Sequence, residues 1–139
     1  MSSRVILDTG ALYAMADQDD AWHDRVAAWI ATSRDVFVIP VTVLPEACHL
    51  MNTWLGQEAE VRFVSSLIHK EQTIENLSPP DVRRANEVLR RYSDANIGFV
   101  DATVVALAER LGIRRLVTTD RRHFGIIRPR HCPAFELLP

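Results

Sequence analysis

Val5-Ile6-Leu7-Asp8-Thr9-Gly10 combines a buried-strand pattern with a carboxylate that follows it directly. Three aliphatic residues succeed one another without a polar interruption, which is typical of a strand buried on both faces in the middle of a parallel sheet. Thr9 and Gly10 end this run, and residues 11–16 favour a helix. The pattern predicts that Asp8 lies at the carboxyl end of a central strand, where open α/β sheets bind their ligands.

The overall composition is that of an ordinary globular protein. The 139 residues predict a single domain over 1–139, and apolar residues make up 47% against 24% charged ones. The net charge of -2 gives no general basic surface, so binding of nucleic acid would depend on a local patch. Lys70 is the single lysine, which excludes a Walker-type phosphate loop because that loop ends in a lysine after a glycine-rich run.

The cysteines and the apolar runs indicate a cytoplasmic protein. Cys48 and Cys132 are too few and too far apart for a disulfide framework. The sequence shows no signal-peptide pattern and no apolar run long enough to cross a bilayer, so no membrane association is expected. The pairs Cys48-His49 and His131-Cys132 lack the ligand spacing of structural zinc sites, and core or surface roles are expected for them.

Short apolar runs alternate with helical patterns along the rest of the chain. Further strands are predicted at residues 36–39, 73–77, 116–119 and 134–138. Thr42 is expected to cap a helix that has Leu44, Ala47, Met51 and Trp54 on one face. In the next helix, over 58–68, the residues expected to face inward are Val61, Val64 and Ile68. Strands that alternate with helices predict an α/β fold with a parallel sheet covered on both sides.

Four acids occupy the positions where such a sheet would bring them together. Asp8 and Asp120 each follow a predicted strand, whereas Glu46 and Asp101 lie in the first turns of helices. Strand carboxyl ends and the amino ends of the following helices share one edge of the sheet. Carboxylates packed together raise one another's pKa unless a cation neutralises them, and oxygen ligands alone favour Mg²⁺ or Mn²⁺.

Each acid taken alone also has a simpler explanation. Asp101 fits a helix cap, Asp120 fits a turn residue, and Glu46 fits a solvated helix position. Asp94 is either an additional acid of the same site or an ordinary loop residue. Asp8 is the most informative of the five, because a central strand rarely needs an acid at its end for folding. The joint pattern, rather than any single acid, predicts a metal site.

The chain resembles PIN-domain proteins, and most closely the ribonuclease toxins of VapBC-type toxin–antitoxin pairs. The matching segments stand in family order and cover nearly the whole chain. They are VILDT at 5–9, PEA at 45–47, YSD at 92–94, FVDA at 99–102, ALA at 106–108 and TTDRRHF at 118–124. Gly10 departs mildly from the family, in which many members carry another small or polar residue, and leaves the acid in place.

The resemblance implies a three-layer α/β/α fold with about five parallel strands and a metal-dependent endoribonuclease that uses Mg²⁺ or Mn²⁺. It maps the catalytic and metal site onto Asp8, Glu46, Asp101 and Asp120. Asp8 and Asp101 are expected to contact the metal, while Glu46 and Asp120 complete its surroundings. Thr9 or Thr119 is expected to orient a carboxylate or a phosphate. RNA, a cognate antitoxin and a second copy of the chain are the expected partners.

Arginines that follow the last acid are candidates for holding the RNA. Arg121 and Arg122 come directly after Asp120, and Arg128 and Arg130 follow soon after. They either bind phosphates beside the cleaved bond or are surface charges that balance the eighteen acids. His123 is expected to pack or to form a hydrogen bond rather than to catalyse.

Two other functions compete with the nuclease. Asp8-Thr9-Gly10 is the signature tripeptide of aspartic proteases, but those enzymes are all-β and this tripeptide leads into a helix. A PIN fold that serves only as an RNA-binding or scaffold module with little activity is the second alternative. Four retained acids favour the enzyme, since a scaffold has no need for carboxylates that repel one another.

Overall fold

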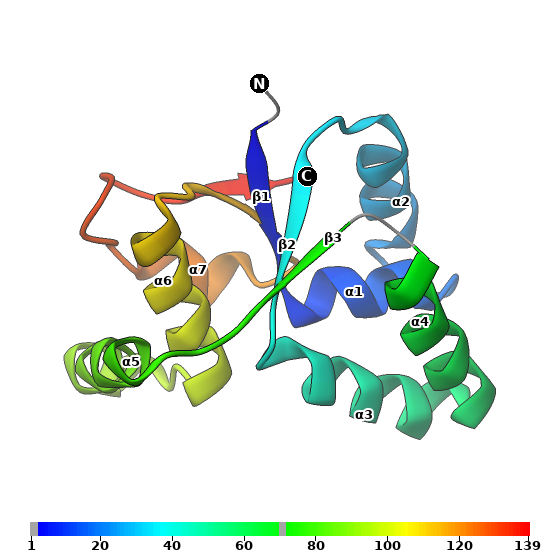
Figure 1. Cartoon of the computed structure of the whole chain (residues 1–139), viewed down its shortest axis with the longest axis horizontal. Coiled ribbons are helices and arrows are strands. Elements are labelled where there is room, and N and C mark those ends of the chain that lie inside the picture. Colours follow the sequence, from blue (N-terminus) through cyan, green and yellow to red (C-terminus); the bar gives the residue numbers. More distant parts are fainter. Residues whose placement is uncertain (1–2, 70–71) are drawn as a thin grey trace.

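The computed structural model describes residues 3–69 and 72–139, and these residues form one five-stranded sheet with helices around it (Figure 1). All strand pairs run parallel, and the strand order is β3-β2-β1-β4-β5. The strands are β1 (Arg4–Leu7), β2 (Val36–Pro40), β3 (Gln72–Glu75), β4 (Arg115–Val117) and β5 (Glu136–Leu138). The predicted parallel α/β fold is therefore confirmed.

Strand β1 occupies the centre of the sheet, as its apolar run predicts. Val5 and Ile6 are fully buried, and Ile6 pairs with Val38 of β2 on one side and Leu116 of β4 on the other. A strand that neighbours cover on both edges and both faces can present a polar side chain only at its ends. Asp8 follows the last residue of β1 and lies at the carboxyl edge of the sheet.

The helices cover both faces of the sheet. Figure 1 shows α1, α2 and α4 on one side, and α5 and α6 on the other. The helices are α1 (Thr9–Ala16), α2 (His23–Thr32), α3 (Val43–Leu55), α4 (Gln57–His69), α5 (Pro79–Arg91), α6 (Phe99–Leu111) and α7 (Arg121–Ile126), with a 3-10 turn η1 (Ser93–Ala95). Helix α6 is buried almost all round from Ala102 to Ala108 and fills much of the core. None of the described helices has the length and apolar character needed to cross a membrane.

The prediction for the inner face of α4 is wrong. The exposed fractions of the three side chains predicted to face inward are 55% for Val61, 43% for Val64 and 75% for Ile68. The residues that face the protein interior instead are Ala59, Phe63 and Leu67. These two sets form neighbouring apolar stripes on one helix, and only packing against the rest of the chain determines which stripe is covered.

Helix α3 differs from its prediction at both ends. Ala47 and Met51 are buried as expected, but Trp54 near the carboxyl end is largely exposed. Thr42 occupies the N-cap position of α3 as predicted, but its side chain makes no capping hydrogen bond, because its Oγ1 lies 2.7 Å from Oγ1 of Thr103 on α6. This contact joins the start of α3 to α6 across the carboxyl edge of the sheet. The prediction of a single domain over residues 1–139 stays a prediction.

Candidate active site

The four predicted acids line one cavity at the carboxyl edge of the sheet. The cavity has a volume of about 400 Å³, and its walls include Asp8, Glu46, Asp101 and Asp120. Thr9, Thr119 and His123 line the same cavity, together with Gly10, Leu50 and residues 98–100. Asp94 is exposed on η1 and does not contribute to these walls. The structure thus brings together the residues that follow β1 and β4 and the first turns of α3 and α6.

Asp8 is buried, and the charged groups that act on it are the acids Asp101 and Glu46. One carboxylate oxygen, Oδ2, accepts a hydrogen bond of 2.9 Å from Thr118 Oγ1, whereas Oδ1 has no hydrogen-bond partner among the described residues. Burial raises the pKa of Asp8 to about 7, the negative charges of Asp101 and Glu46 add to the rise, and the hydrogen bonds from Thr118 and Thr9 oppose it.

Thr118 holds Asp8 in place, and it is not among the predicted site residues. Its hydroxyl donates to Asp8 and also accepts a hydrogen bond of 2.9 Å from the backbone N–H of Asp120. Sheet register provides the missing signal. Leu7 pairs with Val117, so the residues that follow them, Asp8 and Thr118, lie side by side. Thr118 therefore connects the two strand-end acids directly.

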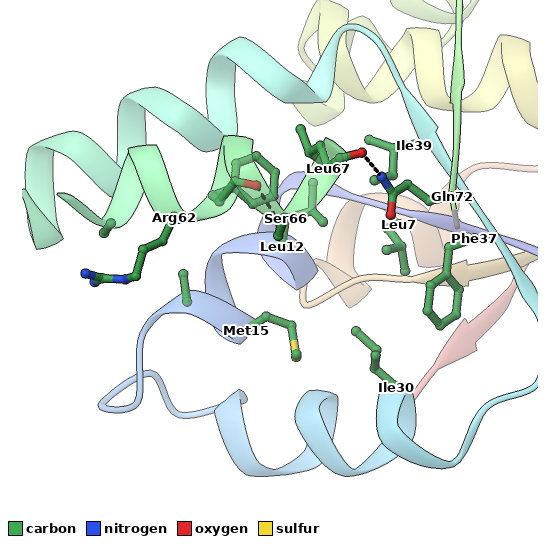
Figure 2. Close-up of a pocket in the computed structure, with 13 residues that line it drawn as sticks. Leu7, Leu12, Met15, Ile30, Phe37, Ile39, Arg62, Ser66, Leu67 and Gln72 are labelled. Atoms are coloured by element: carbon green, nitrogen blue, oxygen red, sulfur yellow. Dashed lines mark hydrogen bonds between the residues drawn. The ribbon is translucent and has the colours of Figure 1, made fainter. Parts of the chain in front are cut away.

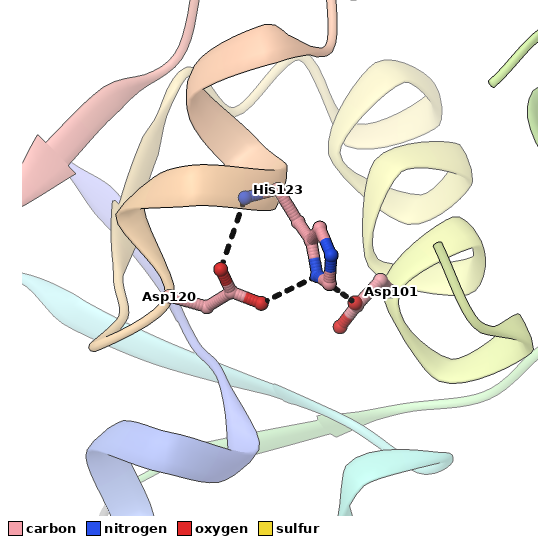
Figure 3. Close-up of side chains that lie close together, drawn as sticks. All are labelled: Asp101, Asp120 and His123. Atoms are coloured by element: carbon pink, nitrogen blue, oxygen red, sulfur yellow. Dashed lines mark hydrogen bonds and ion pairs between the residues drawn. The ribbon is translucent and has the colours of Figure 1, made fainter. Parts of the chain in front are cut away.

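Asp101, Asp120 and His123 form a second group within the cavity (Figure 3). The Nδ1 atom of His123 lies 2.9 Å from Asp120 Oδ2 and 3.6 Å from Asp101 Oδ2. The other oxygen of Asp120, Oδ1, accepts a hydrogen bond of 3.0 Å from the backbone N–H of His123 and so caps α7. The expectation that His123 forms a hydrogen bond is confirmed.

The pKa of Asp101 shows that the acids act on one another. Burial raises this pKa to about 6, and the negative charges of Asp120 and Glu46 also raise it. The nearby His123 imidazole lowers it, but less than burial raises it. The side chains of Asp8 and Asp101 are thus held in surroundings that disfavour their charged forms. A bound cation would reverse that preference.

Gly10 packs closely against Thr119, which follows β4. A Cβ atom on Gly10 would overlap the hydroxyl of Thr119, so a larger residue here requires Thr119 to shift. The departure from the family pattern at this position therefore has a local cause in the close approach of Thr119.

The chemistry of this donor set suits a divalent cation. Its oxygens come from four carboxylates, and the buried Oδ1 of Asp8 lacks a partner that a cation would supply. Asp101, Asp120 and His123 each offer one ligand atom, and these atoms lie within 4.8 Å of one another. His131 contacts the backbone, as expected for a core or surface role: its Nε2 lies 2.8 Å from the Ile113 carbonyl oxygen.

A family model described as the PIN domain matches residues 5–127. The chain belongs to the PIN-domain family. Among characterised relatives, Ribonuclease VapC26 of Mycobacterium tuberculosis is 33% identical over 135 residues, which are 97% of this chain and 100% of the relative. The 23S rRNA-specific endonuclease VapC20 of the same species is 26% identical over 116 residues, which cover 84% and 88% of the two chains. The predicted resemblance to VapC ribonucleases is confirmed.

Solved structures show the same PIN fold. The crystal structure of Mycobacterium tuberculosis VapC20, described as a sarcin-ricin loop cleaving toxin, superposes with a TM-score of 0.80. Its sequence identity is 24%, over 85% of this chain and 91% of that one. The DNA-bound VapBC from Salmonella typhimurium has a TM-score of 0.68 and 16% identity, over 99% and 97% of the chains.

The arginines that follow the acids of this PIN domain differ in their surroundings. Arg121 lies over the ring of Trp22, 5.2 Å from its centroid, and donates a hydrogen bond to the Pro139 carbonyl oxygen. Arg122 is exposed. Arg130 instead pairs with Glu87 on α5, at 2.7 Å, and Arg128 donates to the Gly125 carbonyl oxygen. Phosphate binding by Arg121 and Arg122 stays a prediction.

Proposed function

We propose that this chain is an endoribonuclease that hydrolyses RNA phosphodiester bonds with Mg²⁺ or Mn²⁺ and acts as the toxin of a type II toxin–antitoxin pair. The observation that carries the proposal is the buried Asp8 carboxylate, which has an unpartnered oxygen and three further acids around it. Such an arrangement disfavours the charged form and has no purpose in a fold that only serves as a scaffold. The relatives named as ribonucleases support the same activity.

Each residue of the cavity has a proposed task. Asp8 and Asp101 hold the cation, and Thr118 fixes the orientation of the Asp8 carboxylate. Glu46 and Asp120 complete the acidic surroundings, while Thr9 and Thr119 orient the scissile phosphate. When bound, the divalent cation lowers the pKa of a water molecule and neutralises charge on the leaving oxygen. Arg121 and Arg122 bind phosphates beside the cleaved bond.

A second cavity, which is mostly apolar, supports an antitoxin partner. It has a volume of about 380 Å³ between the sheet and α1, α2 and α4 (Figure 2). Leu12, Met15 and Ile30 line it, and Val61 and Val64 are exposed on α4. Apolar surface of this kind is typical of a protein interface. We propose that a cognate antitoxin covers it, and that the toxin forms a homodimer in the cytoplasm.

Cleavage of total RNA by the purified protein tests the activity. We expect discrete products with Mg²⁺ or Mn²⁺ and none with a chelator, and ribosomal RNA is the first product class to map because one relative is a 23S rRNA-specific endonuclease. Asp8→Asn should lower the rate at least about 1000-fold, since it removes a primary metal ligand. Asp19→Asn, which changes an exposed acid outside the cavity, is the matched control.

Cleavage that survives the chelator would contradict a metal-dependent nuclease. Full activity in Asp8→Asn, or an equal loss of activity in the Asp19→Asn control, would contradict the role of Asp8 as a metal ligand. Metal binding without any cleavage of the tested RNA would favour the scaffold module instead. The folded state of each variant is checked by circular dichroism before its rate is interpreted.

A further inference from the structure

The acidic cavity contains an imidazole, that of His123, among its carboxylates. His123 is the only histidine of the described chain that lines the acidic cavity, and its Nδ1 faces Asp120 Oδ2 at 2.9 Å and Asp101 Oδ2 at 3.6 Å. Figure 3 shows the imidazole between the two carboxylates, with its Nδ1 edge toward both of them. The three side chains come from α6, from the end of β4 and from α7.

We infer that His123 is a direct metal ligand, and that Nδ1 of His123, Oδ2 of Asp101 and Oδ2 of Asp120 form a mixed nitrogen–oxygen site for a divalent transition-metal ion. This inference rests on the proposed function, because it assigns a further ligand to the same cavity. Asp101 belongs to this set and its charge also acts on Asp8, so it is the carboxylate that connects the two parts of the site.

The spacing of these atoms fits a common ion. Two ligand atoms at right angles around an ion with bonds of about 2.1 Å lie about 3.0 Å apart, and the tetrahedral separation is about 3.4 Å. The two measured distances, 2.9 Å and 3.6 Å, are close to this range. Small side-chain shifts are sufficient to bring all three atoms to bonding distance.

Two further observations point to a cation rather than to a closed hydrogen-bond cluster. Asp8 lines the same cavity, is 4% exposed, and has an unpartnered Oδ1. The backbone N–H of His123 donates to Asp120 Oδ1, so the peptide chain fixes the imidazole and the Asp120 carboxylate relative to each other. Such a fixed pair loses little conformational freedom when it binds a metal.

A nitrogen ligand changes which metal the site prefers. Imidazole favours transition-metal ions, whereas Mg²⁺ is bound mainly by carboxylates and water. Ligation through Nδ1 requires the neutral tautomer that carries its proton on Nε2. The site should therefore bind Mn²⁺ more tightly than Mg²⁺, and the difference should depend on His123.

Electron spin-echo envelope modulation of the Mn²⁺-loaded protein tests the ligation directly. The wild type should show coupling of Mn²⁺ to a directly bound ¹⁴N nucleus, and labelling with ¹⁵N-histidine should replace this signal. His123→Gln should abolish it and lower the Mn²⁺ affinity about 10- to 100-fold by calorimetry, with a change of less than about threefold for Mg²⁺. His69→Gln, an exposed histidine at the end of α4, is the control and should leave both unchanged.

A wild-type spectrum without histidine nitrogen coupling would overturn the inference, and so would a coupling that persists in folded His123→Gln. If that variant does not fold, the ¹⁵N-labelled wild type still decides, because His123 is the only histidine on the cavity wall in the described chain. A residue that only positioned Asp120 would weaken binding without nitrogen coupling. RNA cleavage without the coupling would leave the proposed function intact, whereas coupling without cleavage would support the ligand and contradict the nuclease.

Discussion

Asp8 and Asp81 are buried almost equally, with exposed fractions of 4% and 3%, but their surroundings are opposite. Asp81 is the third residue of α5, and its Oδ2 accepts hydrogen bonds from the backbone N–H and the hydroxyl of Ser78. The guanidinium of Arg110 on α6 lies 3.1 Å from its other oxygen. Asp8 has one hydroxyl donor, Thr118, and its charged neighbours Asp101 and Glu46 are acids.

The pKa values of the two groups diverge accordingly. Burial alone would raise both, but the hydrogen bonds from Ser78 and the Arg110 charge lower the pKa of Asp81. The hydrogen bonds to Asp8 do not offset its burial and its acidic neighbours, and its pKa rises to about 7. Asp81 is thus an acid whose charge the protein itself neutralises and uses for folding. Asp8 is an acid whose neighbours disfavour its charge, and such raised pKa values cluster at functional sites.

Replacing each aspartate with asparagine should change stability in opposite directions. Asp81→Asn leaves Arg110 without its partner and should lower the unfolding free energy by about 2–4 kcal/mol. Asp8→Asn removes an uncompensated buried charge and should raise it by about 1–3 kcal/mol at pH 8 without metal. Urea unfolding in a chelating buffer measures both. A loss of stability in Asp8→Asn as large as that in Asp81→Asn would remove the distinction between the two acids.

The pH dependence should also have opposite signs. The pKa of Asp8 is raised from 3.8 to about 7, so the folded state holds its proton where the unfolded state has lost it. The unfolding free energy of the metal-free protein should therefore fall as pH rises from about 4 to about 7, then level off, with Asp101 contributing up to about pH 6. The contribution of Asp81, whose pKa is lowered, is present above its unfolded pKa and is lost in acid.

The difference in unfolding free energy between wild type and Asp8→Asn, measured across this pH range, isolates the contribution of Asp8. Adding a divalent cation at 100 times its dissociation constant should then stabilise the wild type by about 2.7 kcal/mol at pH 8 and by less at pH 5, where Asp8 is protonated. Asp81→Asn should keep this stabilisation and Asp8→Asn should lose most of it. Equal metal stabilisation in both variants would be inconsistent with a primary role of Asp8 in binding.

The positions of the acids could be predicted because they depend on local pattern and sheet geometry alone. A run such as Val5-Ile6-Leu7 specifies a central strand, and every parallel strand delivers its next residue to the same edge. Glu46 and Asp101 follow from the same rule, since the helices after β2 and η1 begin at that edge. No information about side-chain contacts is needed for this step.

The contacts within the site and the covered face of α4 could not be predicted in the same way. Helix α4 carries two adjacent apolar stripes, and packing covers only the one with Phe63. Helix α7 follows Asp120 with Arg121 and Arg122 and shows no apolar periodicity that would identify it. Predicting that Thr118 bonds to Asp8 requires the register of β1 against β4, which the sequence pattern does not specify. Each of these features depends on a neighbour that lies far away along the chain.

Substitution of Thr118 tests the contrast between Asp8 and Asp81 most specifically, and its expected effect is the smallest. Thr118→Val keeps the shape of a fully buried side chain and removes the hydroxyl that donates to Asp8 and accepts from the Asp120 N–H. Because the charged form of Asp8 loses its one side-chain donor, its pKa should rise further, and affinity for Mg²⁺ or Mn²⁺ should fall about tenfold by calorimetry.

Thr119→Val is the matched control, since Thr119 is the neighbouring threonine on the cavity wall and makes no hydrogen bond to Asp8 in the described structure. It should change metal affinity by less than about threefold. The corresponding change at the structural acid, Ser78→Ala, should lower stability by about 1 kcal/mol and leave metal affinity unchanged, because Asp81 is outside the cavity. If Thr118→Val affected only stability and not metal affinity, Asp8 would be a structural acid like Asp81, and the cation would depend on the other three carboxylates.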